Sequence, residues 1–253
     1  MGRTLQAVTD TPADDLKPSF RSDVTVELVK HTASDSDVLF AARVSTVGEQ
    51  SLDELKKDPE RSKGLINYLM RDRHGSPFEH NSMTFFINAP IFVFREFMRH
   101  RVGWSYNEES GRYRELQPVF YVPGESRKLV QEGRPGKYVF VDGTQAQQEL
   151  TGRVMEDSYR RAYEAYQEML AAGVAREVAR AVLPVGLFSS MYATCNARSL
   201  MHFLGLRTQH ELAKVPSFPQ REIEMVGEKM EAEWARLMPL TYAAFNANGR
   251  VAP

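Results

Sequence analysis

An unusual concentration of polar and charged side chains lies in residues 95–115 of this chain. These 21 residues hold five arginines, four glutamates, two serines, one histidine and one asparagine. Arg95 and Arg99 are four residues apart and share one face of a helix, and His100 and Arg101 continue past its end into a glycine-containing loop. Because a planar guanidinium binds phosphate through two parallel hydrogen bonds, the segment indicates a site for an anionic ligand.

The order of these residues bears on the interpretation. Arg-His-Arg at 99–101 is followed by Ser-Gly-Arg-Tyr at 110–113, and Gly111 allows a ligand to approach the backbone closely. An exposed, salt-bridged helix end is the alternative, and spacing alone fits both. A solvated helix end would more often use lysine and glutamate, which favours the ligand site.

The composition is that of a globular protein with a small ligand. The chain has 253 residues, 42% of them hydrophobic and 26% charged, and a formal net charge of −1. Proteins that bind nucleic acid usually carry a strong basic excess, so we expect no nucleic-acid partner. Arginine outnumbers lysine 23 to 9, which fits either a GC-rich genome or anion binding.

The single cysteine, Cys195, excludes a disulfide framework and a cysteine-based zinc site within the chain. We expect Cys195 to be a small buried residue and expect no metal. No apolar run approaches the roughly 18 residues that cross a bilayer. The first 20 residues lack the order of a signal peptide. These features fit a cytoplasmic enzyme without a membrane partner.

The elements that position the polar segment are predicted from periodicity and turn residues. We expect a flexible tail over 1–22 and a single α/β domain over 23–253, with strands early and helices late. Residues 102–115 read as irregular and 116–143 as a long excursion or flap. Strands are predicted at 24–29, 83–87, 119–122, 138–141 and 187–194. Helices are predicted at 35–43 with Ser34 or Asp35 as N-cap, 52–71 broken near Pro59, 90–99, 145–172, 174–183 and 196–206, with one or two more over 222–245.

The polar segment resembles the signature of the flavin-dependent thymidylate synthases, an Arg-His-Arg followed by Ser after seven or eight residues. Eight residues, 102–109, intervene here. Residues 74–80 are similar to the family's upstream segment, where a serine or threonine contacts FAD. Residues 176–184 are similar to its dUMP-binding helix, and residues 196–207 to its FAD and substrate segment. The four matches occur in order; residues 208–219 and the N-terminal tail look longer than is usual in the family.

The resemblance implies a fold of α+β type, with a central mixed or antiparallel sheet, long helices and FAD bound in a non-Rossmann manner. No GxGxxG fingerprint occurs in the sequence. The resemblance also implies a homotetramer with sites shared between subunits. The implied reaction methylates dUMP to dTMP, with 5,10-methylenetetrahydrofolate as one-carbon donor and FAD, reduced by NADPH, as hydride source.

The resemblance assigns roles to individual residues. Arg207 would be catalytic, stabilising the electron-rich pyrimidine; without the resemblance it reads as a helix C-terminal arginine. Ser110 lacks an evident base and is assigned to binding, and Arg176 to a salt bridge. The implied FAD contacts are Ser76, Arg99, His100, Arg101, Glu108, Asn196, Arg198 and His202. The implied dUMP contacts are Glu96, Phe97, Met98, Arg99, Glu108, Glu109, Ser110, Gly111, Arg112, Arg180 and Arg207.

Three alternatives remain open from the residues themselves. One is a nucleic-acid module that uses Trp104, Tyr106 and Tyr113 as stacking platforms, against which the net charge counts. Another is a flavoprotein of different chemistry that has kept the binding site. The third is a structural protein with no ligand.

Overall fold

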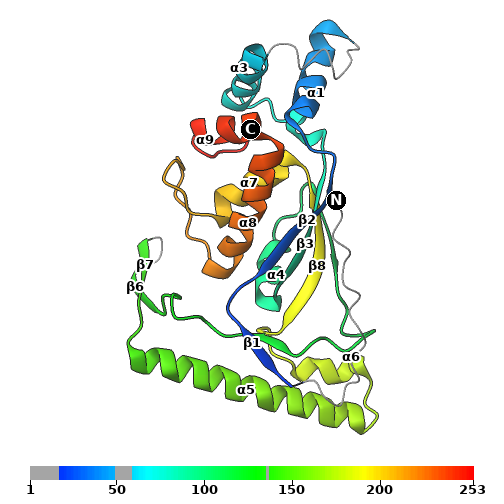
Figure 1. Ribbon diagram of the computed structural model, residues 1–253, viewed down its shortest axis with the longest axis vertical. Coiled ribbons are helices and arrows are strands. Elements are labelled where there is room, and N and C mark those ends of the chain that lie inside the picture. Colours follow the sequence, from blue (N-terminus) through cyan, green and yellow to red (C-terminus); the bar gives the residue numbers. More distant parts are fainter. Residues whose placement is uncertain (1–16, 49–58, 135–136) are drawn as a thin grey trace. The chain divides into compact units, whose positions relative to one another are not determined.

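A computed structural model of the chain describes residues 17–48, 59–134 and 137–253 (Figure 1). The protein is of mixed α/β class, as predicted. The chain divides into two compact units. Unit 1 comprises the residues up to Ser22, Ser110–Leu129 and Asp142–Phe188; unit 2 comprises Asp23–Glu109, Val130–Val141 and Ser189–Pro253. The single domain expected over 23–253 stays a prediction.

The helices and strands are labelled in Figure 1. The strands are β1 (Ser19–Arg21), β2 (Thr25–His31), β3 (Met83–Pro90), β4 (Trp104–Glu108), β5 (Val119–Tyr121), β6 (Val130–Arg134), β7 (Lys137–Val141) and β8 (Phe188–Cys195). The helices are α1 (Asp35–Val47), α3 (Pro59–Arg71), α4 (Ile91–Phe97), α5 (Gln145–Ala171), α6 (Arg176–Ala179), α7 (Ala197–Arg207), α8 (Arg221–Leu237) and α9 (Pro239–Ala247), with 3-10 turns η2 (Ser76–Glu79) and η3 (Arg180–Val182).

The main sheet of unit 2 has the strand order β2-β3-β8-β4. The pairs β2–β3 and β4–β8 are antiparallel, and a register shift interrupts the first between Leu28 and Lys30. Side-chain hydrogen bonds from Thr84 to Thr194 and from Asn88 to Ser190 show that β3 and β8 also run antiparallel. The expected central sheet of mixed or antiparallel type is therefore confirmed.

The core of unit 2 lies between this sheet and the helices. In β3 the alternate residues Met83, Phe85 and Ile87 are fully buried, as the two-residue period of a strand requires. Cys195 is buried, as expected, and burial raises the pKa of its thiol. A thiol held in the neutral form is a poor nucleophile.

Helix ends in unit 2 follow local signals. Ser34 caps α1 through a capping box with Asp37, and the helix continues beyond residue 43 to Val47, where Gly48 ends it at φ 76°.

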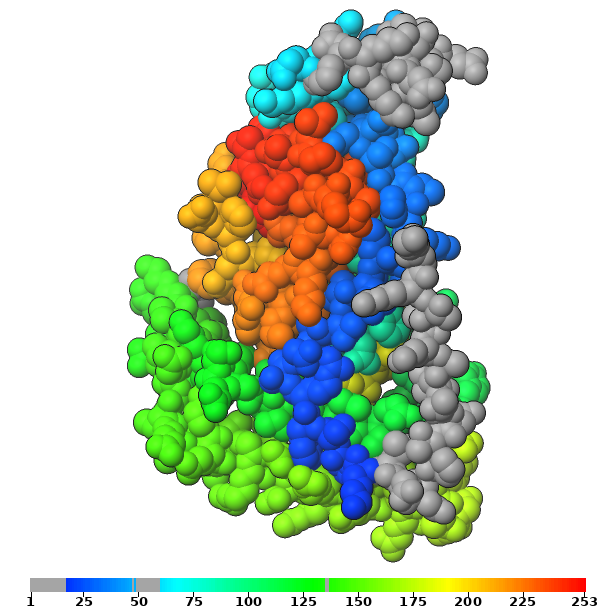
Figure 2. Space-filling model, in the orientation of Figure 1, coloured from blue at the N-terminus to red at the C-terminus, as the bar shows by residue number. Residues whose placement is uncertain are grey.

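α8 lies along β2, where Lys229 Nζ donates to the carbonyl of Val24 at 2.8 Å. Figure 2 shows the orange and red C-terminal helices packed against the blue N-terminal part of this unit.

Unit 1 is organised around α5, the long green helix in Figure 1. Thr144 and Gln147 form its capping box. Its buried face carries Tyr159, Tyr163 and Tyr166, spaced four and three residues apart as one helical face requires. Phe120 stacks on Tyr159 with ring centroids 5.0 Å apart. β5, which carries Phe120, pairs in parallel with β1.

Several sequence predictions need correction. Residues 104–108 form strand β4, although 102–115 was predicted to be irregular, because pairing with β8 decides their conformation. Residues 19–21 of the expected tail form β1. The helix predicted at 174–183 is one short turn, α6, continued by η3. Residues 52–58 of the helix predicted at 52–71 lie outside the described residues, and α3 begins at Pro59.

Neither a helix long and apolar enough to cross a membrane nor a group of three or more histidine, cysteine, aspartate or glutamate side chains suited to a metal ion occurs within 17–48, 59–134 and 137–253.

Candidate active site

Three predicted site residues meet in unit 2 at the C-terminal end of α7. Arg207, the last residue of that helix, donates from Nη1 to Glu96 Oε2 at 2.5 Å and from Nε to His100 Nε2 at 3.1 Å. The two partners are 111 and 107 residues away in sequence. The side chains of Arg207 and Glu96 are 21% and 23% exposed, so the guanidinium is fixed yet reachable. Among the described residues, no acceptor forms a hydrogen bond with its Nη2.

The surroundings set the charge of this cluster. Burial raises the pKa of Glu96, which the Arg207 guanidinium opposes and the Glu222 carboxylate reinforces. Burial also lowers the pKa of His100 to about 4, with help from the charges of Arg207 and His202. His100 is therefore neutral near neutral pH. Because its Nε2 accepts from Arg207, its proton lies on Nδ1.

The depressed pKa of His100 predicts a pH-dependent stability. The ordinary value is 6.5 and the folded value about 4, so below pH 6.5 the unfolded chain binds a proton that the folded protein resists. This contribution is complete above pH 6.5 and is lost as the pH falls toward 4. Between about pH 7 and pH 5, urea unfolding should show a larger drop in the free energy of unfolding for the wild type than for His100→Gln. Equal drops in both proteins would contradict this account of His100.

The turn that carries 99–101 is tied to the start of α7. Ser199 Oγ donates to the carbonyl of Val102 at 2.9 Å, and Gly103 follows with φ 70°. A Cβ on Gly103 would collide with Ser199 Oγ and lie 3.1 Å from Asn196 Nδ2. The eight-residue spacing of the motif thus contains a left-handed glycine turn that lets the loop meet α7 before β4 begins.

Tyr106 supports the same turn from the sheet. Its hydroxyl lies 3.0 and 2.9 Å from the carbonyl oxygens of Phe97 and His100. Burial raises the pKa of Tyr106, so the hydroxyl keeps the proton it donates. Sequence analysis treated Tyr106 only as a stacking platform and did not single out Ser199; the alternation of apolar and polar residues in 104–107 was a usable signal for Tyr106.

The residues next to His100 differ in exposure. Arg99 and Arg101 are exposed, and within the described part of the chain neither forms an ion pair or side-chain hydrogen bond. Met98 is 38% exposed, whereas the Phe97 side chain is fully buried and stacks on Phe203. The Phe97 side chain therefore belongs to the core, and contact with a ligand is left to its backbone.

A second group of predicted residues gathers where η2 meets α7 in unit 2. Arg198 donates from Nε to Pro253 at 2.7 Å and from Nη1 to Glu79 at 2.5 Å. Gly75, just before Ser76, makes room for that guanidinium, since its Cβ would lie 2.6 Å from Arg198 Cζ. Burial lowers the pKa of His202, and the charges of Arg198 and Arg73 add to the effect. Arg73, which sequence analysis missed, thus belongs to this group.

The remaining predicted residues of unit 2 are Asn196, Glu108 and Glu109, which lie at the ends of helix α7 and strand β4. Asn196 caps α7, its side-chain oxygen accepting from the backbone N–H of Ser199 at 2.9 Å. Glu108 ends β4 opposite Met191. The backbone N–H of Glu109 donates to the carbonyl of Ser190 at 2.8 Å. Asn196 therefore has a structural role whether or not it also contacts a cofactor.

Unit 1 holds the other predicted dUMP contacts. Gly111 lies against Arg180, since its Cβ would stand 3.5 Å from Arg180 Cδ. Ser110 Oγ accepts from the backbone N–H of Arg112 at 3.3 Å, and the Arg112 guanidinium pairs with Glu177 at 2.7 Å. These contacts make residues 110–112 and Arg180 one local group. Arg180 is exposed and, within the described residues, has no ion-pair partner.

Two further expectations concern neighbouring side chains. Arg176, expected to form a salt bridge, lies 3.9 Å from Glu115. The suggested stacking platforms Trp104 and Tyr106 stack on one another, with ring centroids 5.7 Å apart. Because both are half-buried against Phe97, they are poor platforms for nucleic-acid bases.

The donor set suits a ligand that carries phosphates and a flat polar ring. In unit 2, the exposed guanidiniums of Arg99 and Arg101 can bind phosphate oxygens. A neutral His100 offers one N–H, and Arg207 offers the unpaired end of its fork. These groups fit both a nucleotide and a flavin dinucleotide.

Known proteins share this sequence and fold. A model of the family described as thymidylate synthase complementing protein matches residues 27–240. A flavin-dependent thymidylate synthase of Streptomyces avermitilis is 96% identical over 246 residues, which are 97% of this chain and 100% of that protein. One of Tropheryma whipplei is 58% identical over 240 residues, 94% of this chain and 98% of that protein. The crystal structure of the UMP/dUMP methylase PolB from Streptomyces cacaoi, bound with 5-Br dUMP, has a TM-score of 0.87 at 56% identity and covers 93% of this chain and 100% of that one.

Proposed function

Because the chain belongs to the family of flavin-dependent thymidylate synthases, we propose that Arg207 is the residue that activates dUMP when this enzyme methylates it to dTMP. The observation that carries the proposal is the fixation of Arg207 between Glu96 and His100, with Nη2 left for a ligand. C5 of uracil is a poor nucleophile, and losing the N3 proton makes the ring electron-rich. A fixed guanidinium beside N3 and its carbonyl stabilises that anion without reorganising.

Each neighbour of Arg207 contributes to this state. Glu96 accepts from Nη1 of the guanidinium and His100 accepts from its Nε. Since His100 is neutral, it accepts the hydrogen bond without adding a positive charge that would repel Arg207. The buried Cys195 takes no part as a nucleophile, because burial keeps its thiol protonated. The protein therefore polarises the substrate instead of attacking it.

The enzyme uses a flavin, which we propose to be FAD, regenerated by NADPH and supplying hydride when bound. 5,10-Methylenetetrahydrofolate would supply the carbon. Arg99, His100, Arg101, Ser76, Glu108, Asn196, Arg198 and His202 would hold FAD. The exposed guanidiniums of Arg99 and Arg101 support this assignment, as does the chemistry of a pyrophosphate, which needs several cationic donors.

The phosphate and ring of dUMP would be bound by the residues that sequence similarity suggests. Ser110, Gly111, Arg112 and Arg180 would contact the nucleotide from one local group. Glu96 to Arg99 would contribute from α4 and the Arg-His-Arg turn, and Glu108 and Glu109 from the end of β4. We further propose a cytoplasmic homotetramer with sites shared between subunits, on the basis of the family alone.

Flavin content and substrate-stimulated reduction test this function together. We expect the purified protein to be yellow, or to take up added FAD, and to oxidise NADPH faster when dUMP is present. Absorbance at the visible flavin band reports the flavin content, and the fall in absorbance at the NADPH band reports the oxidation rate. A colourless protein that also fails to take up FAD would refute the flavin assignment, and an NADPH oxidation rate indifferent to dUMP would refute the substrate.

A further inference from the structure

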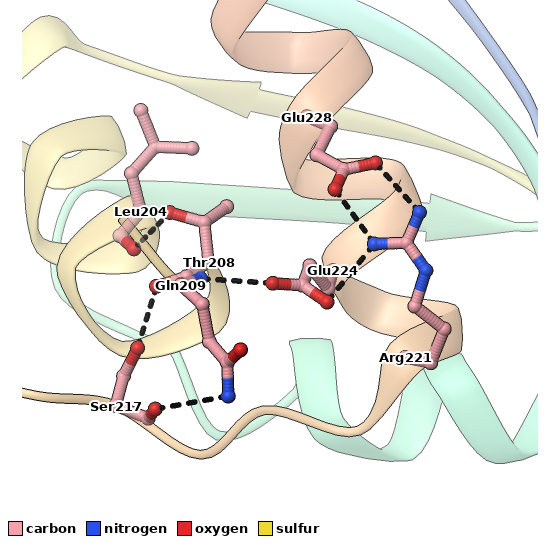
Figure 3. Close-up of polar contacts among 7 residues, drawn as sticks. All are labelled: Leu204, Thr208, Gln209, Ser217, Arg221, Glu224 and Glu228. Carbon is pink, nitrogen blue, oxygen red and sulfur yellow. Dashed lines mark hydrogen bonds and ion pairs between the residues drawn. The ribbon is translucent and has the colours of Figure 1, made fainter. Parts of the chain in front are cut away.

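Thr208 directly follows Arg207 and closes the C-terminal end of α7. The residue is 4% exposed. Its backbone N–H and its Oγ1 both donate to the carbonyl of Leu204, at 3.0 and 2.8 Å (Figure 3). The same Oγ1 accepts from Arg250 Nη2 at 3.1 Å. The hydroxyl thus uses its proton and a lone pair at once, which fixes its rotamer.

Arg250, the donor to Thr208, is itself held by a buried ion pair. Its side chain is 1% exposed, and its two terminal nitrogens donate to Glu231 at 2.6 and 2.8 Å. Asn246 Oδ1 accepts a further hydrogen bond at 2.8 Å, and the guanidinium lies 5.0 Å from the Phe245 ring centroid. The backbone of Arg250 has φ 54°, a conformation that a non-glycine residue keeps only where its surroundings impose it.

The segment after Thr208 is fastened to α8 in the same place. Gly227 allows α8 to approach, since its Cβ would lie 2.8 Å from Thr208 Cγ2. Ser217 Oγ donates to the Thr208 carbonyl at 2.5 Å, and the N–H of Gln209 donates to Glu224 at 2.9 Å. Figure 3 shows the last two hydrogen bonds, with Glu224 also paired to Arg221. Thr208 is therefore restrained by its side chain, by its own carbonyl and by the N–H of the following residue, Gln209.

We propose that Thr208, held by Arg250 and Glu231, is a positioning residue that sets the place of the Arg207 guanidinium. The inference rests on the proposed function of Arg207. Glu96 and His100 bind two of its nitrogens, but a long flexible side chain is aimed only if its backbone is fixed too. Thr208 supplies that restraint one residue away, and the buried ion pair makes it rigid. None of these three residues needs to contact the substrate.

Thr208→Val tests the proposal, because valine keeps the branched shape and removes the hydroxyl. A misplaced catalytic group can cost up to about 100-fold in rate, and we expect kcat for dTMP formation to fall about tenfold. The KM for dUMP should change little, because the lost interaction is one made in the transition state. Flavin absorbance should stay at the wild-type level. Thr208→Ser, which restores the hydroxyl, should recover kcat, and Glu233→Gln on α8, where Glu233 pairs with the exposed Arg236, should not alter it.

Several outcomes would overturn the inference. Wild-type kcat in Thr208→Val would do so, and so would equal losses in the valine and serine variants. If Thr208→Val does not fold, Arg250→Lys decides: lysine keeps a charge for Glu231 but cannot bind it and Thr208 together, so a wild-type kcat there refutes the proposal and a fall in kcat with flavin retained supports it. Arg207→Ala, measured in parallel, separates failure of the Thr208 proposal from failure of the proposed function, since an active Arg207→Ala enzyme refutes the role of Arg207 itself.

Discussion

Replacing Arg207 with alanine should lower dTMP formation by at least about 100-fold while the protein keeps its flavin. Losing one preorganised donor that stabilises charge in a transition state typically costs about 10²–10³-fold in kcat. Arg207 is such a donor, because Glu96 and His100 fix it and its Nη2 has no partner among the described residues. Rapid-quench measurement of dTMP, with flavin absorbance recorded on the same sample, checks both parts of the prediction.

A matched control is available on α8. Arg236 is 65% exposed and pairs with Glu233 at 2.8 Å, and exposed ion pairs of this kind contribute little to stability. Arg236→Ala should form dTMP at the wild-type rate. A near-normal rate for Arg207→Ala would assign the activation of dUMP to another group, whereas loss of both rate and flavin would make Arg207 a cofactor ligand.

Replacing Gly103 with alanine should greatly weaken flavin binding. The residue has φ 70°, where a side chain costs about 1–3 kcal/mol, and its Cβ would collide with the buried Ser199. Relief of that collision requires the loop to move away from α7, and Arg99, His100 and Arg101 move with it. Titration of the flavin-free variant with FAD should give a Kd raised by at least about tenfold, which corresponds to only 1.4 kcal/mol.

Gly64 in α3 provides the control for this substitution. No atom lies within 4 Å of a Cβ built there, and alanine is the better helix former by about 1 kcal/mol. Gly64→Ala should bind FAD normally and unfold at the same or a higher urea concentration. If Gly103→Ala bound FAD as tightly as Gly64→Ala, the left-handed turn would have no bearing on the cofactor site.

The fold was predictable where local patterns and packing agree. The buried alternation of β3 and the tyrosine face of α5 follow from the periods of a strand and a helix. β4 was missed because Ser105, Asn107 and Glu108 are exposed, so the segment reads as polar. The short alternation over 104–107 is a weak signal, and the strand conformation is decided by pairing with β8, which lies far along the chain.

For the candidate site, the sequence suggests which residues take part but not how they pair. The family motif points to Arg207, His100 and Glu96, yet nothing in the sequence says that one guanidinium binds the other two. Contacts over more than one hundred residues depend on how α4 and α7 pack. The support from Tyr106 and Thr208 was missed for the same reason, since each acts through a hydroxyl that reaches a distant backbone or guanidinium group.

Complementation of a strain that lacks thymidylate synthase tests the central claim most directly, because growth requires the whole conversion of dUMP to dTMP. Expression of this chain should allow growth without thymidine, and expression of Arg207→Ala at the same protein level should not. Failure of the wild-type chain to support growth, when it is present as folded, flavin-containing protein, would contradict the proposed function.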